Sequence, residues 1–456
     1  MFKHSLFGTD GVRGLITELT PEFVVRLAEA IATYFPPGSR LLVGRDVRAG
    51  GEAYARIISG TLLYFGVKVY DAGLTPTPAL QYAVKTLGFD GGVIVTASHN
   101  PREYNGIKVI GPDGIELDRD REKELEEIFW KGRFRSIDWK AISHSIEPYR
   151  IVNQVYVDGV VEKVDKELIA SRKLRILIDP ANSVGALTTP EIAKRLGVEY
   201  LVLNGSLDSR FPSRNPEPTP ENIFETAQVV KSLGLDLGVA QDGDADRSIF
   251  IDNLGRVQSG DRTASLLAKY LKTERGEHGK VYTAVSSSMV IEDVMKDIGV
   301  EVVWLKVGSV DIAHAMKKGG DALCGFEENG GFMYPPHQYV RDGGMTLALF
   351  LEMLAMFKTT PSELYDSLPY YYSVKTKYKM GRDKALLVVE RVKEEFKTER
   401  LITIDGVKVV GRDYWVLVRP SGTEPLLRVM LEARSESDAK SIFERIDKIV
   451  KEAGTE

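Results

Sequence analysis

Apolar runs of strand type alternate with amphipathic helical patterns along most of the chain. Three segments share one plan, in which an early strand ends in a polar turn, a helix follows, and a later strand ends in an unusual loop. The early strands are expected at Arg40–Arg48, Arg175–Ser183 and Lys280–Ser288. The later strands with their loops are expected at Gly92–Pro101, Leu237–Arg247 and Ala322–Gly331. The helices between them are expected at Glu52–Phe65, Pro190–Leu196 and Met289–Ile298. This alternation favours parallel or mostly parallel sheets, which gather ligands at the carboxyl ends of their strands, where the three loops lie.

The last part of the chain has a different pattern. One strand and one helix are followed by strands with no helix between them, and a final helix begins after Ser435. The strands and the first helix are expected at Tyr370–Lys379, Asp383–Phe396, Gly406–Val410, Tyr414–Val418 and Leu426–Glu432. Such an order is typical of an antiparallel α+β unit.

These patterns predict an α/β fold of three similar tandem α/β domains with mixed, mostly parallel sheets, and a C-terminal α+β domain. A length of 456 residues fits three or four domains. The expected domains are residues 1–150, 151–255, 256–368 and 369–456.

Composition narrows the classes of partner. With 43% hydrophobic and 27% charged residues the chain has a composition typical of water-soluble globular proteins, and a net charge of −5 gives no reason to expect nucleic acid or a membrane as partner. The single cysteine, Cys324, excludes an internal disulfide and favours a reducing cytoplasm. The first residues show no apolar signal segment, and Thr346–Phe357 is better interpreted as a buried helix than as a membrane span. The oligomeric state is left open, with a homodimer as one candidate.

The loop DGDADR places Asp242, Asp244 and Asp246 at alternate positions after an apolar strand. Alternate side chains of an extended chain share a face, and crowded carboxylates favour a hard cation such as Mg²⁺. A calcium loop is excluded because Arg247 stands where that loop needs Gly, and Asn253 where it needs Glu. The alternative is a solvated acidic turn.

The loop TASHNP brings Ser98 and His99 to the end of another strand. No G-x-S-x-G pattern marks a hydrolase nucleophile, so the serine fits better as a carrier of a phosphoryl group, with Arg13, His99 and Lys108 as available cations. The alternative is a structural turn built on Asn100 and Pro101.

Two further loops carry polar groups between glycines. RPSGTEP combines the Arg419 guanidinium with two hydroxyls, which suits a phosphate, although a plain hairpin turn is the alternative. GFEENGG supplies Glu327, Glu328 and Asn329, which suit sugar hydroxyls, although an ordinary polar loop is the alternative.

Taken in order, these loops resemble the α-D-phosphohexomutase family, which includes phosphoglucomutases, phosphomannomutases and phosphoglucosamine mutases. The resemblance covers essentially the whole chain and is carried by FGTDGVRG, VGRDVR, TASHNP, YNGIK, DGDADR, GFEENGG and RPSGTEP. It implies a heart-shaped molecule around a central cleft. By the matching motifs, Ser98 is the implied phosphoserine, and Asp242, Asp244 and Asp246 with a phosphoserine oxygen are the implied Mg²⁺ ligands, with Arg247 beside them.

The same resemblance assigns the remaining candidate residues. Lys108 falls at the family's candidate general acid/base position, with His99 as a second candidate, and Arg13 matches an arginine near the phosphoserine. Glu327 and Asn329 are the implied sugar contacts. The implied phosphate-binding residues are Arg419, Ser421, Gly422 and Thr423.

Two departures from the family pattern concern substrate binding. Asn329 and Gly331 stand where many members have Ser and His, and His337 is the candidate substitute. Leu426 stands where a Lys is common, so phosphate binding is expected to depend more on Arg419 and Arg428.

The expected activity is transfer of phosphate between C1 and C6 of a hexose, through phospho-Ser98 and a hexose 1,6-bisphosphate that also serves as activator. Mannose and glucose phosphates are the favoured substrates, and a phosphoglucosamine mutase is the alternative. A Mg²⁺-dependent sugar phosphatase is a more distant alternative, and a non-enzymatic sugar-phosphate binding protein is a third class. The sequence contains no Walker A pattern, which argues against a P-loop kinase.

Overall fold

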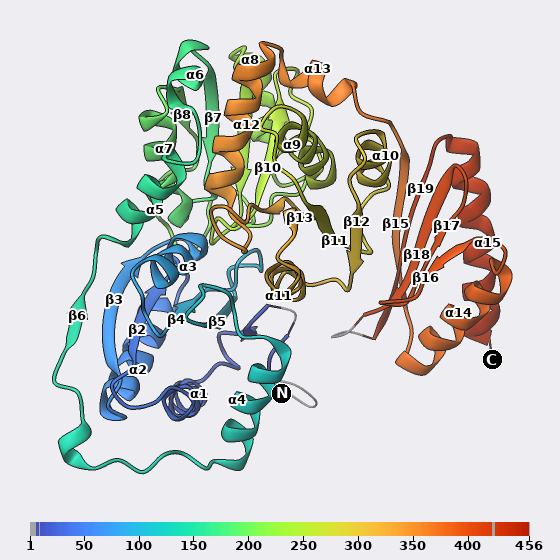
Figure 1. The fold of residues 1–456 in the computed structure, drawn as a ribbon. Coiled ribbons are helices and arrows are strands. Elements are labelled where there is room, and N and C mark those ends of the chain that lie inside the picture. Colours follow the sequence, from blue (N-terminus) through green and yellow to red (C-terminus); the bar gives the residue numbers. More distant parts are fainter. Residues whose placement is uncertain (1–5, 9, 422–424, 456) are drawn as a thin grey trace.

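Four units, each built on its own sheet, follow one another along the chain. The structure is a computed structural model, and it describes residues 6–8, 10–421 and 425–455. Figure 1 shows the units in an arc, with the first and the fourth at its two ends, which gives the molecule a heart-shaped outline. We call them the first to fourth units in chain order.

The first unit has a six-stranded sheet in the order β1-β5-β4-β2-β3-β6. The neighbouring strands β4, β2, β3 and the edge strand β6 are parallel, whereas β5 pairs antiparallel with both β4 and β1. Its elements are β1 (Val12–Leu15), α1 (Pro21–Tyr34), β2 (Arg40–Arg45), α2 (Gly51–Tyr64), β3 (Lys68–Leu74), α3 (Thr77–Thr86), β4 (Gly91–Val95), β5 (Tyr104–Ile110), α4 (Arg119–Lys131), a 3₁₀ turn (Trp139–Ala141) and β6 (Ile146–Pro148).

The second unit has a four-stranded sheet in the order β10-β9-β7-β8, with β10 antiparallel to β9 and the other pairs parallel. All five residues of β9 are buried, as expected for a central strand covered on both faces. Its elements are α5 (Val152–Val161), α6 (Lys166–Ser171), β7 (Arg175–Asp179), a 3₁₀ turn (Val184–Leu187), α7 (Thr189–Arg195), β8 (Glu199–Val202), α8 (Phe224–Ser232), β9 (Leu237–Gln241) and β10 (Ser248–Asp252).

The third unit repeats this plan with the sheet β12-β11-β13-β14, in which only the pair β13–β14 is antiparallel. Its apolar helix α12 packs against α5, α6 and α7 of the second unit and thereby joins the two units in one core. Its elements are α9 (Gly260–Thr273), β11 (Lys280–Ala284), α10 (Val290–Asp297), β12 (Val302–Leu305), α11 (Ser309–Gly319), β13 (Ala322–Glu327), β14 (Gly331–Met333), α12 (Gly343–Phe357) and α13 (Pro361–Asp366).

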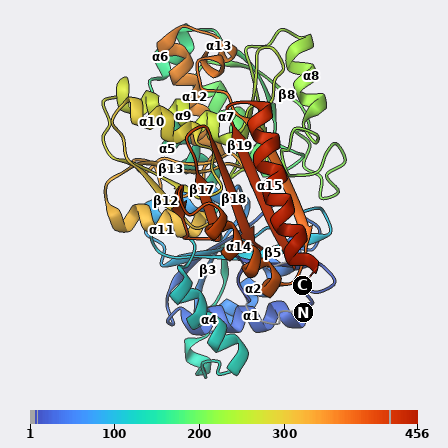
Figure 2. The same cartoon turned by 90° about the vertical axis from the view of Figure 1, so that its right-hand side faces the viewer.

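The fourth unit is an antiparallel sheet in the order β15-β19-β18-β17-β16. In Figure 2, α14 and α15 cover the outer face of this sheet, and Trp415 and Leu417 on its other face pack against Val285 and Met289 of the third unit. Its elements are β15 (Tyr372–Lys379), α14 (Arg382–Glu395), β16 (Arg400–Ile402), β17 (Val407–Val410), β18 (Tyr414–Pro420), β19 (Leu426–Ala433) and α15 (Glu436–Thr455).

The predicted fold class is confirmed, and the three later strands end where the sequence places their loops. Each of these loops also joins its strand to an antiparallel neighbour, in the pairs β4–β5, β9–β10 and β13–β14. Thr346–Phe357 lies within α12, which is buried along nearly its whole length. None of the helices in the described parts of the chain combines the length and apolar character that a bilayer crossing requires.

Candidate active site

The backbone of Ser98 is held in an unusual conformation at the carboxyl end of β4. Its φ is 48°, in the left-handed region that side chains other than glycine rarely adopt, and such strain is concentrated at functional sites. The Thr96 hydroxyl oxygen accepts from the Ser98 N–H at 2.9 Å and donates to Asp46 at 2.6 Å. Asp46 in turn accepts from the buried Arg48 guanidinium at 3.2 Å. The serine is thus fixed through its backbone, which leaves its hydroxyl available for chemistry.

Arg48 holds the rest of the same loop. Its guanidinium donates to the carbonyl oxygens of Ser98 at 2.6 Å, Asn100 at 2.5 Å, Pro101 at 2.7 Å and Tyr104 at 3.1 Å. One planar fork therefore satisfies three carbonyl groups of a turn that has no regular secondary structure of its own, and the carbonyl group at the start of β5.

The aspartate loop of the second unit presses directly against the serine loop of the first. A Cβ at Gly243 would stand 2.4 Å from the carbonyl oxygen of Ser98, so only glycine permits this approach. The Ser98 hydroxyl donates to Asp242 at 2.8 Å, and the Thr77 hydroxyl donates to Asp244 at 2.6 Å. The structure therefore brings the predicted phosphoserine and the predicted metal ligands into contact.

The three aspartates form a buried cluster. One ligand oxygen from each of Asp242, Asp244 and Asp246 can be chosen so that all lie within 4.8 Å of one another. Burial and the two neighbouring carboxylates raise the pKa of Asp242 well above its ordinary value, and burial also raises the pKa of Asp246. One oxygen each of Asp244 and Asp246 has no hydrogen-bond partner among the described residues, and the Nε of Arg247 lies 3.9 Å from Asp242 and 3.8 Å from Asp246. Crowded, partly unsatisfied carboxylate oxygens fit a hard divalent cation such as Mg²⁺.

Lys108, on β5, reaches the same cluster from the other side. Its ammonium lies 3.1 Å from Asp10, 3.3 Å from Asp244, 3.4 Å from Asp246 and 3.6 Å from Glu116. Burial alone would lower the pKa of Lys108, but the surrounding carboxylates outweigh burial and raise it above its ordinary value. In this arrangement the ammonium can donate a proton or a hydrogen bond, and its role as general acid/base stays a prediction.

His99 and Arg13 lie beside the serine. The His99 Nδ1 is 3.4 Å from the Ser98 hydroxyl oxygen. Burial and the charges of Arg247 and Arg13 hold the pKa of His99 well below its ordinary value, which keeps the imidazole neutral. Arg13 donates to the side-chain oxygen of Asn100 at 3.0 Å and so ties the first strand to the serine loop.

The sugar-binding candidate Glu327 is joined to the aspartate cluster by Arg341. The Arg341 guanidinium donates to Glu327 at 3.0 Å, to Asp10 at 2.8 Å and to Asp246 at 2.5 Å. These acceptors belong to the third, first and second units, so a single buried arginine connects all three at the site.

Two further residues predicted for sugar binding, Asn329 and His337, lie in different surroundings. Asn329 sits in the loop between β13 and β14, where its side-chain oxygen accepts from the Gly331 N–H at 3.2 Å. His337 is buried, stacks on Tyr82 of α3 with ring centroids 4.3 Å apart, and lies 3.2 Å from Asp342. Its ring is thus used in packing, which does not support His337 as a substitute sugar contact.

The predicted phosphate-binding residues lie on the fourth unit. Arg419 and Arg428 are directly opposite each other on β18 and β19, and Arg419 donates to Asp405 at 2.7 Å. Ser421 is buried at the end of β18, whereas Gly422 and Thr423 lie outside the described residues. Phosphate binding by this loop stays a prediction.

Sequence reasoning missed three residues that shape this site. Asp10 and Arg48 lie inside the quoted motifs FGTDGVRG and VGRDVR, whose charged residues could have suggested them. Arg341 lies in YVRDG, where a charged pair just before a long apolar helix is a comparable signal. Burial of each side chain is what marks it in the structure.

Replacing Arg48 with methionine should lower kcat by about a hundredfold, because small displacements of a reacting group cost about that much. It should also cost about 3–5 kcal/mol of stability, because Asp46 would be left buried without its cation. Initial rates and thermal melting test both effects. The control Arg56→Met removes an exposed arginine that pairs with Glu52 and should leave both unchanged. A normal kcat in the Arg48 variant would contradict the positioning role.

Comparison with known proteins gives matches over the whole chain. The four domains described as phosphoglucomutase/phosphomannomutase alpha/beta/alpha domains I, II and III and C-terminal domain match residues 4–136, 154–255, 259–372 and 374–449. A "Phosphoglucosamine/phosphogalactosamine mutase" of Sulfurisphaera tokodaii is 53% identical over 98% of this chain and 99% of its own length. A "Phosphoglucomutase/phosphomannomutase" of Thermococcus kodakarensis is 40% identical over the same shares. A crystal structure of a phosphoglucomutase/phosphomannomutase family protein from Burkholderia thailandensis is 26% identical, covers 100% of this chain and 98% of its own, and has a TM-score of 0.88.

The four family matches together include strands of every sheet described above. The chain therefore belongs to the phosphoglucomutase/phosphomannomutase family of the α-D-phosphohexomutase superfamily.

Proposed function

We propose that this mutase interconverts the 1-phosphate and the 6-phosphate of a hexosamine, with glucosamine phosphate as its main substrate. The observation that supports the reaction is the contact between the Ser98 hydroxyl and Asp242 inside the carboxylate cluster. The sugar is supported by the relative that is 53% identical over nearly the full length and is named for amino-sugar phosphates. This preference replaces mannose and glucose as the leading expectation.

The reaction begins with a phosphoryl group on the Ser98 oxygen. A free hydroxyl of the sugar monophosphate attacks phosphorus, the new P–O bond forms, and the bond from phosphorus to the serine oxygen breaks. The sugar then carries two phosphates and reorients in the site. Its other phosphoryl group is transferred to Ser98 by the reverse exchange. The number of phosphoryl groups is unchanged, so the enzyme is restored.

The protein's contribution is to position groups and neutralise charge, as in other phosphoryl transfers. Arg247 and Lys108 present positive charge beside the transferring group. The neutral His99 imidazole is placed to accept the proton of the attacking sugar hydroxyl and to give it to the released serine oxygen, which lies 3.4 Å from its Nδ1. Asp242, Asp244 and Asp246 would hold Mg²⁺, whose chemistry when bound is to stabilise negative charge on the phosphoryl oxygens. Arg419 and Arg428 would hold the phosphate that is not being transferred.

The sugar assignment is tested by comparing kcat/KM for the 1-phosphates of glucosamine, galactosamine, glucose and mannose in the presence of Mg²⁺. We expect kcat/KM for glucosamine phosphate to exceed the values for glucose and mannose phosphates by at least about tenfold, since a site that hydrogen-bonds a polar substituent of its substrate discriminates strongly against sugars that lack it. A clear preference for glucose or mannose phosphate would overturn the hexosamine proposal and favour the second candidate.

That second candidate is a phosphoglucomutase/phosphomannomutase, which the relative at 40% identity favours. The same assays separate both mutases from a phosphatase, because a phosphatase releases inorganic phosphate as its main product. A phosphatase reaction that uses the aspartates directly would also leave the strained backbone conformation of Ser98 without a function.

A further inference from the structure

Position 331 requires glycine because the Arg341 side chain occupies the space that a Cβ would need. A Cβ at position 331 would stand 2.3 Å from Cδ and 2.7 Å from Cγ of Arg341. Both distances are far below van der Waals contact, and the φ of Gly331 lies outside the left-handed region, so sterics and not backbone strain exclude a side chain here.

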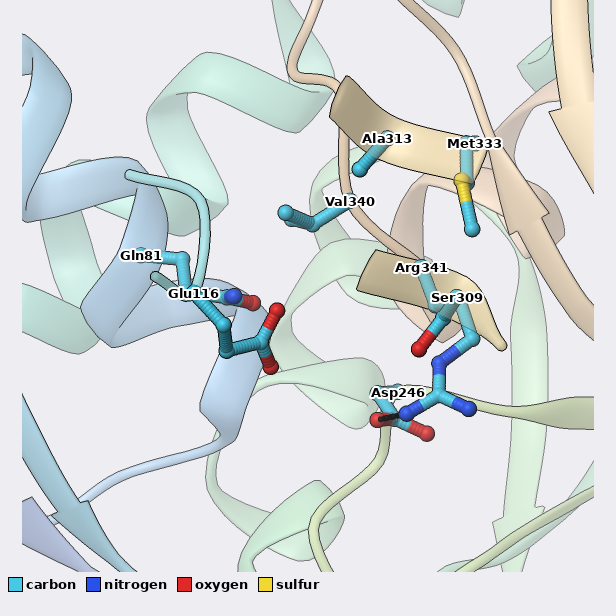
Figure 3. Close-up of a pocket in the computed structure, with 8 residues that line it drawn as sticks. All are labelled: Gln81, Glu116, Asp246, Ser309, Ala313, Met333, Val340 and Arg341. Carbon is cyan, nitrogen blue, oxygen red and sulfur yellow. Dashed lines mark hydrogen bonds and ion pairs between the residues drawn. The ribbon is translucent and has the colours of Figure 1, made fainter. Parts of the chain in front are cut away.

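The atoms that would collide belong to the middle of the Arg341 side chain, not to its tip. Arg341 cannot yield by turning only its guanidinium, because Cγ and Cδ set the direction in which that group points. In Figure 3 the side chain runs from the third unit to Asp246, and a dashed line marks their contact. Its side chain is only 4% exposed, so it has little room to adopt a second path.

The guanidinium fixes the sugar loop relative to the phosphoryl-transfer centre. One nitrogen donates to Glu327, and another donates to Asp10 and Asp246. A planar fork can serve two such directions at once, whereas an ammonium is a single point charge. The position of Glu327 therefore depends on the route of the Arg341 side chain past Gly331.

We propose that Gly331 and Arg341 act as one unit that positions Glu327 for the sugar and so determines how tightly the sugar is bound. Many family members have a histidine side chain at the position of Gly331. In this chain the Arg341 side chain occupies the space beside position 331 instead, and it enters from the segment before α12. This inference rests on the proposed function, because it concerns the sugar that the mutase binds.

The test is a double-mutant cycle with Gly331→Ala, Arg341→Lys and the two together. Each single variant should raise KM for the sugar phosphate by at least about tenfold and change kcat less, because Glu327 is displaced before chemistry begins. The double variant should resemble Arg341→Lys to within about threefold instead of showing the product of both effects, because Arg341→Lys has already removed the guanidinium fork that Gly331→Ala displaces. The substrate is glucosamine 1-phosphate, or glucose 1-phosphate if the wild type prefers it.

Two controls separate this role from a general loss of structure. Gly60→Ala adds a methyl group on α2 where no atom lies within 4 Å, and it should leave KM unchanged. Melting temperatures show whether each variant is folded at the assay temperature. Multiplying effects in the double variant, or a KM for Gly331→Ala within about twofold of wild type, would overturn the proposal. A wild type that turns over neither sugar phosphate would instead overturn the proposed function, and this inference with it.

Discussion

Replacing Ser98 with alanine should reduce mutase turnover by at least about a thousandfold, because loss of a covalent carrier removes the reaction path and not one contact along it. The fold should survive. The Ser98 backbone is held by Thr96 and Arg48, whose bonds to it do not involve its hydroxyl. The lost hydrogen bond to Asp242 should cost about 1–3 kcal/mol, which a domain of this size tolerates.

Turnover in both directions, circular dichroism and intact mass test this prediction together. The wild type should carry, in part of the molecules, the extra mass of one phosphate, and the variant should not. Ser171→Ala is the control, because Ser171 is exposed on α6 and its hydroxyl only caps a local carbonyl. Full turnover by the alanine variant would show that another group carries the phosphate, and phosphate release without isomerisation would favour the phosphatase.

The architecture could be predicted because its signals are local. Strand and helix alternate in the sequence with the periods that each element imposes, so β4, β9 and β13 and the loops after them could be found from Val93, Val239 and Phe326 and their apolar neighbours. The early strands were expected to be longer than they are. β2 ends at Arg45, because Asp46 leaves the sheet to bind Thr96 and Arg48.

The meeting of the loops could not be predicted from periodicity. Ser98 and Asp242 are 144 residues apart, and contact between them depends on how the first and second units pack. Gly243 shows how close that packing is, but in a sequence a glycine within an acidic loop indicates no more than a turn. Only the resemblance to a family supplied the pairing in advance.

The substrate was harder to predict from the sequence than the fold or the meeting of the loops, because residues of the sugar loop depart from the family pattern. Asn329 and Gly331 depart from the common sugar loop, and His337 is the candidate replacement because many family members have a histidine where this chain has Gly331. The structure instead buries His337 against Tyr82 and directs Arg341 past Gly331. A residue ten positions away in the chain thus fills the space, and no pattern in the sequence expresses that exchange.

The prediction with the next largest effect concerns the metal. Asp244→Asn should raise the Mg²⁺ concentration for half-maximal activity by at least about tenfold and lower saturated turnover by about a hundredfold. The substitution keeps the shape of the side chain. It removes a charge that lies 3.3 Å from Lys108, and it replaces an acceptor oxygen by a donor in a cluster where one oxygen each of Asp244 and Asp246 lacks a hydrogen-bond partner among the described residues.

A binding measurement separates metal affinity from catalysis. Mg²⁺ should raise the melting temperature of the wild type by mass action and raise that of Asp244→Asn much less. Asp252→Asn is the matched control, because Asp252 is equally buried but binds Arg256 and Gln258 away from the cluster. That control should lower the melting temperature and leave the Mg²⁺ titration unaltered. The Asp244→Asn variant could instead lose turnover while its Mg²⁺ titration stays that of the wild type. In that case the aspartates would form ion pairs with Lys108 and not bind a metal. The charge stabilisation assigned to Mg²⁺ would then have to come from the basic side chains alone.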